Sequence, residues 1–142
     1  MITTTTLTQL LQIAGILHLG LLWAGLLMPG AVNLRQHLAT LPAFIRRLFW
    51  VYYSFIGLCL VSFGSITIML AGTLAEGGTL SRAICVFLAA FWTLRLIAAT
   101  FIFDLKPYLT TFRRRLGYHA INLVFIYLPI VYLITAWKGG TA

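Results

Sequence analysis

Four long stretches of apolar residues alternate with short polar segments along the chain. They cover approximately residues 7–28, 48–70, 82–103 and 117–137. At about 1.5 Å of rise per residue, a helix of roughly 21 residues crosses the 30 Å hydrocarbon layer of a bilayer. The pattern therefore predicts an all-α integral membrane protein, in which one transmembrane domain forms a four-helix bundle.

The composition agrees with this class of protein. Some 61% of the residues are hydrophobic and 8% are charged, whereas soluble domains carry about 25% charged residues. No cation precedes the first stretch, so we expect a membrane span there rather than a cleaved signal peptide. Cys59 and Cys85 each lie inside an apolar stretch without C-x-x-C spacing, which favours buried thiols over a redox pair.

Two polar segments resemble each other and indicate a duplication. Residues 33–48 read NLRQHLATLPAFIRRL, and residues 104–116 read DLKPYLTTFRRRL. With a gap of three residues, the Arg-Arg pair that ends the first segment aligns with the last two arginines of the second. Each segment joins two apolar stretches, so the chain is predicted to contain two helical hairpins related by a parallel internal repeat. The spans themselves show no clear repeat.

The cations lie mainly in these two connections. Lys and Arg outnumber Asp and Glu ten to two, and seven of the ten are Arg35, Arg46, Arg47, Lys106, Arg113, Arg114 and Arg115. The positive-inside rule places both connections in the cytoplasm and both termini on the non-cytoplasmic side, in an inner or plasma membrane. Contacts with anionic lipid are predicted for Arg46, Arg47, Lys106, Arg113, Arg114 and Arg115. No nucleic-acid-binding motif accompanies them, so nucleic acid is not an expected partner.

The polar segments also carry local signals. Asn33 and Gln36 have the spacing of a capping box, which predicts a short interfacial helix, although an irregular loop fits nearly as well. The Pro29-Gly30 pair is expected to end the first span, and the glycine-rich residues 71–81 are expected to form a turn. Pro129 removes one helical hydrogen bond and predicts a modest kink in the fourth span.

Ionisable side chains inside the spans are the first candidates for function, because a charge in hydrocarbon is costly unless it is paired or hydrated. Arg95 lies nine residues before Asp104, about 13 Å from the membrane edge. His18 lies eleven residues before Pro29, about 16 Å from the same edge. At a shared site, Arg95 would bind a carboxylate, phosphate or quinone oxygen, and His18 would exchange a proton. The structural alternatives are an arginine that reaches toward the headgroups and a histidine that donates to a neighbouring helix.

Other side chains are weaker candidates for ligand contact. Trp23 and Trp92 would flank a planar ligand, although aromatic residues at helical spacing more often pack in a core. Tyr53, His119 and Asn122 fall near the basic edge, where interface hydration is the simpler interpretation. Asp104 lies at the same edge and is expected to cap the backbone or to pair with the arginines.

Several kinds of chemistry find little support in the sequence. A haem b with two histidine ligands needs both at one depth, whereas His18 lies near the midplane and His119 near the edge. Histidines and carboxylates do not cluster within the spans, so no metal site is predicted. No nucleophile has an adjacent base and no carboxylates are paired, so no catalytic residue is assigned and a non-enzyme is favoured. No motif points to a particular family.

Three functional hypotheses follow. The first is a non-catalytic accessory or assembly subunit that packs with other membrane subunits or with copies of itself. The second is the binding of a hydrophobic small molecule, a quinone, haem or lipid, between the hairpins at Arg95 and His18. The third is a small transporter, which the lack of carboxylates inside the spans disfavours.

Overall fold

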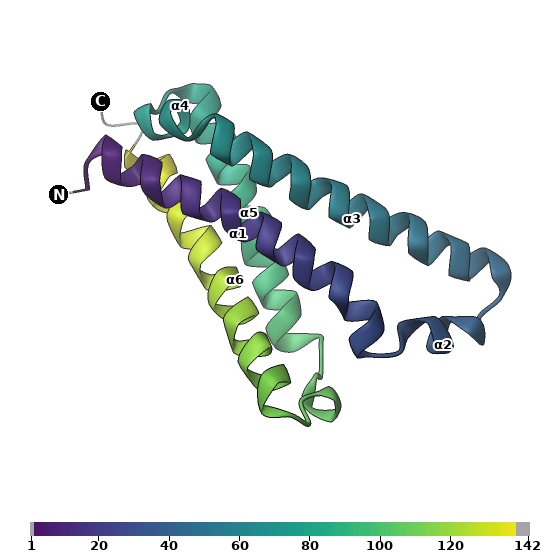
Figure 1. The fold of residues 1–142 in the computed structure, drawn as a ribbon. Coiled ribbons are helices and arrows are strands. Elements are labelled where there is room, and N and C mark those ends of the chain that lie inside the picture. Colours follow the sequence, from purple (N-terminus) through teal and green to yellow (C-terminus); the bar gives the residue numbers. More distant parts are fainter. Residues whose placement is uncertain (1, 139–142) are drawn as a thin grey trace.

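The fold is that of a computed structural model, which describes residues 2–138 (Figure 1). The long helices are α1 (Thr4–Ala31), α3 (Ala43–Met69), α5 (Thr79–Phe101) and α6 (Phe112–Lys138). Short helical segments lie in the connections: α2 (Leu34–Ala39), α4 (Ala71–Glu76) and η1 (Lys106–Tyr108). All four long helices are long and apolar enough to cross a membrane, which confirms the predicted all-α class.

The helices extend beyond the apolar stretches that revealed them. Helix α3 begins at Ala43, so Arg46 and Arg47 lie within its first two turns. Helix α1 continues through Pro29 to Ala31, so the predicted end at the Pro-Gly pair was wrong. Apolar composition marks the part of a helix that faces hydrocarbon, whereas the hydrogen-bonded helix continues until the backbone is capped.

Two connections differ from expectation. Asn33 adopts the left-handed conformation (φ 49°) and makes no side-chain cap bond, so the capping box was wrong, although the short helix α2 does form. Residues 71–76 form helix α4, and the turn is confined to Gly77 and Gly78, with φ of 91° and 113°. Ala71, Leu74 and Ala75 are buried at helical spacing, which explains why this segment is helical.

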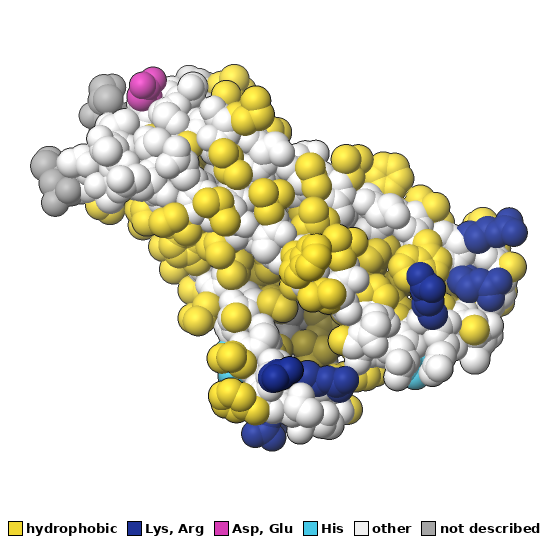
Figure 2. Space-filling view, viewed as in Figure 1, with side chains coloured by type: hydrophobic (Ala, Val, Ile, Leu, Met, Phe, Trp, Pro, Cys, Tyr) yellow, Lys and Arg dark blue, Asp and Glu magenta, His cyan; other side chains and the backbone are white. Residues whose placement is uncertain are grey.

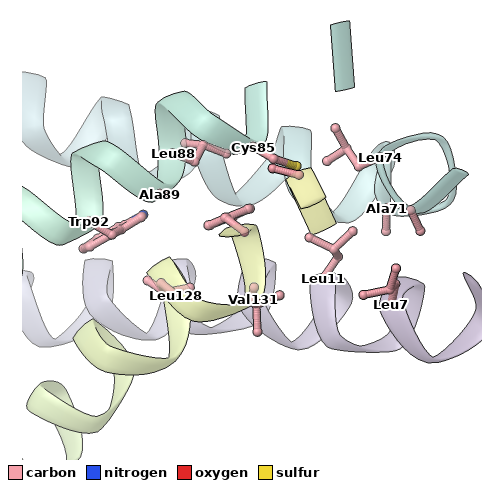
Figure 3. Close-up of a cluster of buried hydrophobic side chains, with 14 of the residues drawn as sticks. Leu7, Leu11, Ala71, Leu74, Cys85, Leu88, Ala89, Trp92, Leu128 and Val131 are labelled. Carbon is pink, nitrogen blue, oxygen red and sulfur yellow. The ribbon is translucent and has the colours of Figure 1, made fainter. Parts of the chain in front are cut away.

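The long helices form two hairpins, α1 with α3 and α5 with α6 (Figure 1). The hairpins meet at the end that carries α4 and diverge toward the two basic connections. Side chains of α1, α4, α5 and α6 point toward one another in the shared core (Figure 3), among them Leu11, Leu74, Leu88 and Leu128. Helix α3 packs mainly on α1 and buries only Gly64 and Thr67. Most of its surface therefore faces outward.

Helices α1 and α3 approach closely where two glycines face each other. A Cβ atom on Gly64 would stand 3.0 Å from the Cβ of His18 and 3.1 Å from the Gly15 carbonyl oxygen. A Cβ atom on Gly15 would overlap the Ile68 side chain and stand 3.0 Å from the Gly64 carbonyl oxygen. Small residues permit such close packing of membrane helices, and here the contact fixes where His18 meets the other spans.

Candidate functional site

Four buried polar or aromatic side chains meet where the hairpins join, one from each long helix. This central cluster consists of His18 of α1, Thr67 of α3, Trp92 of α5 and Tyr132 of α6. His18, Thr67 and Tyr132 have no exposed surface, and Trp92 is 2% exposed. The cluster therefore ties all four spans together inside the apolar core.

Both ring nitrogens of His18 are engaged. Nε1–H of Trp92 donates to Nε2 of His18 over 3.0 Å, and Nδ1 of His18 lies 2.7 Å from the Ala14 carbonyl oxygen. A carbonyl only accepts and an indole N–H only donates, so Nδ1 carries the hydrogen and the imidazole is neutral. Protonating Nε2 would set two N–H groups against each other. The arrangement thus favours a structural histidine over a proton carrier, and a haem iron would find Nε2 already occupied.

The second half of the cluster is a hydroxyl pair. The Tyr132 hydroxyl and Oγ1 of Thr67 are 2.7 Å apart and link α6 to α3 across 65 positions of the chain. The His18 ring packs edge-on against Tyr132, Trp92 and Phe63, with centroid distances of 6.2, 5.1 and 6.4 Å. Among the side chains of residues 2–138, no buried nitrogen or oxygen lacks a hydrogen-bond partner. The cluster is therefore closed, and each of its nitrogen and oxygen atoms has a hydrogen-bond partner.

Arg95 lies one turn beyond Trp92 and is surrounded differently. Its guanidinium carbon stands 5.1 Å from the ring centre of Phe125 and 5.4 Å from that of Phe103. The side chain is exposed, and it makes no hydrogen bond or ion pair with the rest of residues 2–138. The Phe125 ring also stacks on Trp92 at 5.7 Å. Arg95 and His18 are thus connected through Trp92 and Phe125, but His18 is fully buried whereas Arg95 is exposed.

The helical row that contains Arg95 shows which side of α5 it occupies. Phe87 and Phe91, eight and four residues earlier, both contact Phe63 of α3, at 5.9 and 5.1 Å. Residues four apart share a row on a helix, so Arg95 continues this row toward the basic end, where the hairpins diverge. Figure 2 shows a hollow between the diverging hairpins, with an apolar interior and cationic side chains at its rim. The row places Arg95 on the side of α5 that faces the first hairpin.

Comparisons with known proteins do not extend this description. No family model, curated protein or solved structure matches the chain. Within residues 2–138, no three His, Cys, Asp or Glu side chains gather where they would hold a metal ion.

The other predicted site residues lie apart from the central cluster. Trp23 is 65% exposed on α1. His119 is exposed and packs edge-on against Tyr118, with 5.5 Å between ring centres. Asn122 is half-buried, and its side chain makes no hydrogen bond within the described part of the chain. Of the aromatic and polar candidates, the structure brings only Trp92 to His18.

Tyr53 has a structural task that the sequence did not reveal. Pro29 lacks an N–H, so the carbonyl of Gly25, four residues earlier, has no helical partner. The Tyr53 hydroxyl of α3 donates to this carbonyl. A neighbouring helix commonly satisfies a carbonyl freed by proline inside a membrane, and this bond explains how α1 continues past Pro29.

The basic residues divide into two groups. Arg114 donates to the carbonyls of Ala31 and Tyr108 over 3.1 and 3.3 Å, and Arg115 donates to that of Leu109 over 3.3 Å. Those two brace the basic ends of the hairpins. Arg46, Arg47, Lys106 and Arg113 make no side-chain hydrogen bond or ion pair within residues 2–138, which leaves them available to outside groups. Asp104 accepts from the backbone N–H of Lys106 at 3.1 Å, so it caps the connection locally.

Sequence reasoning missed Thr67 and Tyr132 in the core, and Phe103 and Phe125 beside Arg95. A tyrosine inside an apolar span needs a hydrogen-bond partner when it is buried, and that signal could have drawn attention to Tyr132. Its partner was not identifiable, because Thr67 lies 65 positions away and resembles other threonines in the spans.

Proposed function

We propose that the protein is a non-catalytic accessory subunit that assembles with other membrane helices, and that Arg95 is the point of attachment. The observation that carries the proposal is the exposed guanidinium of Arg95, which lies over two phenylalanine rings without a hydrogen-bond acceptor from residues 2–138. A guanidinium has five N–H donors. Leaving them unpaired in an apolar medium is costly, so the acceptor comes from outside the chain.

A partner helix meets this need well. A carboxylate on another membrane helix would accept two parallel hydrogen bonds from the guanidinium, and an apolar helix surface would cover the exposed rings. Phe103 is 51% exposed beside Arg95, which leaves room for such a contact. The central cluster, by contrast, is closed and each of its polar atoms already has a hydrogen-bond partner, which fits a structural rather than a catalytic role.

We expect Arg95→Leu to disrupt a complex that the wild-type protein forms in native membranes. In mild-detergent extracts separated by native electrophoresis, the fraction in the larger complex should fall at least about tenfold, because a desolvated charge pair contributes a few kcal/mol. Arg95→Lys keeps the charge but loses the planar fork of donors, so its effect should be intermediate. A photo-crosslinking residue at position 103 should capture the partner in wild-type membranes.

Two controls accompany this experiment. Arg113→Leu removes an exposed arginine at the same end of the molecule and should leave the complex intact. A photo-crosslinker at position 80, exposed at the other end of α5, should capture less of the partner. A strictly monomeric wild-type protein that yields no crosslink at position 103 would contradict the assembly proposal.

The second candidate is the binding of a hydrophobic small molecule, favoured by the phenylalanine rings that flank the Arg95 guanidinium. The polar end of a quinone or lipid would then contact Arg95, with His18 supporting the site through Trp92. Finding such a molecule in the solvent extract of wild-type protein but not of Arg95→Leu, without any protein partner, would favour this candidate. A transporter would need a hydrated path along the whole length of the hairpins, and at the end that carries α4 buried apolar side chains of α1, α4, α5 and α6 occupy the space between them.

The orientation in the membrane is part of the same proposal. The cations of the two connections lie at the diverging end of the molecule (Figure 2), and helix α4, which ends at Glu76, lies at the other end (Figure 1). This asymmetry supports the placement of both connections in the cytoplasm of an inner or plasma membrane, with both termini on the opposite side. The cationic side chains that make no hydrogen bond or ion pair within residues 2–138 would then face anionic headgroups.

Cysteine labelling tests this orientation. In a variant with Cys59 and Cys85 replaced by alanine, Glu76→Cys should react with an impermeant maleimide in intact cells. Gln36→Cys and Thr111→Cys, one in each basic connection, should react only after the cells are permeabilised. Labelling of one basic connection but not the other in intact cells would contradict the two-hairpin topology.

A further inference from the structure

Two arginines and a tryptophan line an open pocket at the basic end of the first hairpin. The pocket measures about 290 Å³ and is lined by Arg35, Leu38, Arg46 and Trp50. Arg35 and Leu38 come from α2, whereas Arg46 and Trp50 lie one turn apart on one face of α3. The fold of the connection therefore brings together cations that are eleven positions apart in the sequence.

The charges in this pocket are unbalanced. Neither the Arg35 side chain nor the Arg46 side chain forms a hydrogen bond or ion pair with another residue among 2–138. The chain contains only two acidic residues, and they are distant: Glu76 is at the opposite end, and Asp104 caps the other basic connection. Two neighbouring guanidinium groups repel each other unless an anion lies between them. The pocket thus has the positive charge of an anion-binding site, and neither acidic residue of the chain neutralises it.

The rest of the pocket resembles a membrane interface. Trp50 is held by edge-on contacts with Phe49 and Tyr53, each at 5.7 Å. Tryptophan and tyrosine are enriched at the headgroup level of membranes. Leu38 is buried, while Arg35 on the same short helix is exposed. The pocket therefore joins a cationic opening to an apolar wall, which suits a phosphate that carries acyl chains.

We propose that this pocket is a binding site for the phosphate of an anionic membrane phospholipid, held between Arg35 and Arg46 beside Trp50. Arginine binds phosphate oxygens through two parallel N–H donors, and the ring of Trp50 contacts the glycerol region. The proposal rests on the orientation given above, because it requires the basic end to lie in an anionic leaflet. It goes further in assigning one discrete site, and it includes Arg35 among the lipid contacts.

Titration of the purified full chain in neutral detergent with phosphatidylglycerol, followed by native mass spectrometry, tests the site. One lipid should bind first and most tightly. Arg35→Gln and Arg46→Gln should each weaken that binding about tenfold, because each removes a charge-assisted pair of hydrogen bonds to the phosphate. Arg46→Lys should weaken it less. Arg47→Gln makes the same change of charge at a general lipid contact outside the pocket, so it should weaken the first binding clearly less than Arg46→Gln does. Equal thermal midpoints would show that the variants are folded.

Other outcomes would overturn the proposal, and each would point to a different kind of binding. Equal losses of lipid affinity for Arg47→Gln and Arg46→Gln would mean that the lipid is attracted diffusely to the basic end. The general lipid contact would then be retained and the discrete site in the pocket would be rejected. Equal affinity for phosphatidylcholine would show that the negative charge is not recognised. Displacement of the lipid by an equal concentration of inorganic phosphate would identify a free anion site instead. If no variant or wild-type protein bound the anionic lipid, the general lipid contact would fail as well.

Discussion

Replacing His18 by alanine should lower the free energy of unfolding by about 2 to 4 kcal/mol. The imidazole has no exposed surface and lies between all four spans, so its removal leaves a void that the surrounding helices cannot fill without shifting. It also leaves the Trp92 N–H without an acceptor. Unfolding in mixed micelles of neutral detergent and dodecyl sulfate, followed by circular dichroism, measures the loss.

A double-mutant cycle separates the void from the hydrogen bond. Trp92→Phe removes the donor and keeps an aromatic ring, so it should cost less than His18→Ala. The coupling energy between the two sites should be about 1 kcal/mol, because hydrogen bonds between membrane helices contribute only about 0.6 to 2 kcal/mol. A coupling near zero would show that the bond contributes nothing. Unchanged stability of His18→Ala would mean that the cluster does not hold the spans together.

Gly15→Ala should lower the free energy of unfolding by about 1 to 3 kcal/mol, a typical cost of overpacking. The added methyl group would overlap the Ile68 side chain and crowd the Gly64 carbonyl. Neither neighbour can yield easily, because one is a branched side chain and the other is backbone. Helices α1 and α3 would have to separate, which would loosen the contact beside His18. The same micelle titration measures the effect.

Gly20→Ala is the matched control on the same helix. A Cβ atom at position 20 meets nothing within 4 Å, so alanine should be neutral or should stabilise the helix by about 0.5 to 1 kcal/mol. Opposite signs at positions 15 and 20 would establish that contact between helices, and not helix propensity, decides the outcome. A loss at position 20 equal to that at position 15 would contradict the close approach of α1 and α3.

Most of the contacts at the site join residues that are distant in the sequence, and sequence patterns do not reveal such contacts. His18 and Arg95 stood out because polar groups inside hydrocarbon are costly. The sequence did not show that their surroundings differ, because the burial of a side chain depends on which helices diverge and where. His18 lies where the hairpins touch and both its nitrogens are paired. Arg95 lies one turn beyond Trp92, where the hairpins diverge, and its guanidinium is open.

Some predictions of local conformation were wrong for a related reason. Asn33 has the composition of a helix cap but adopts a left-handed conformation without a cap bond. Residues 71–76 contain Gly72 yet form a helix, because their apolar side chains pack against α1 and the core. Helix α1 passes Pro29 because Tyr53 satisfies the carbonyl that the proline leaves free. In each case a tertiary contact outweighed a local preference.

The amino-acid sequence by itself determined the helical class, the four spans and the concentration of cations in two connections. These properties follow from the free energy of transferring a segment from water to hydrocarbon. That free energy depends on the composition and length of the segment. Only the tertiary structure decided that His18 is sealed, that Arg95 is exposed and that Arg35 meets Arg46 beside Trp50. Such relations depend on how separate helices approach each other, and helices distant in the sequence are positioned by packing rather than by local pattern.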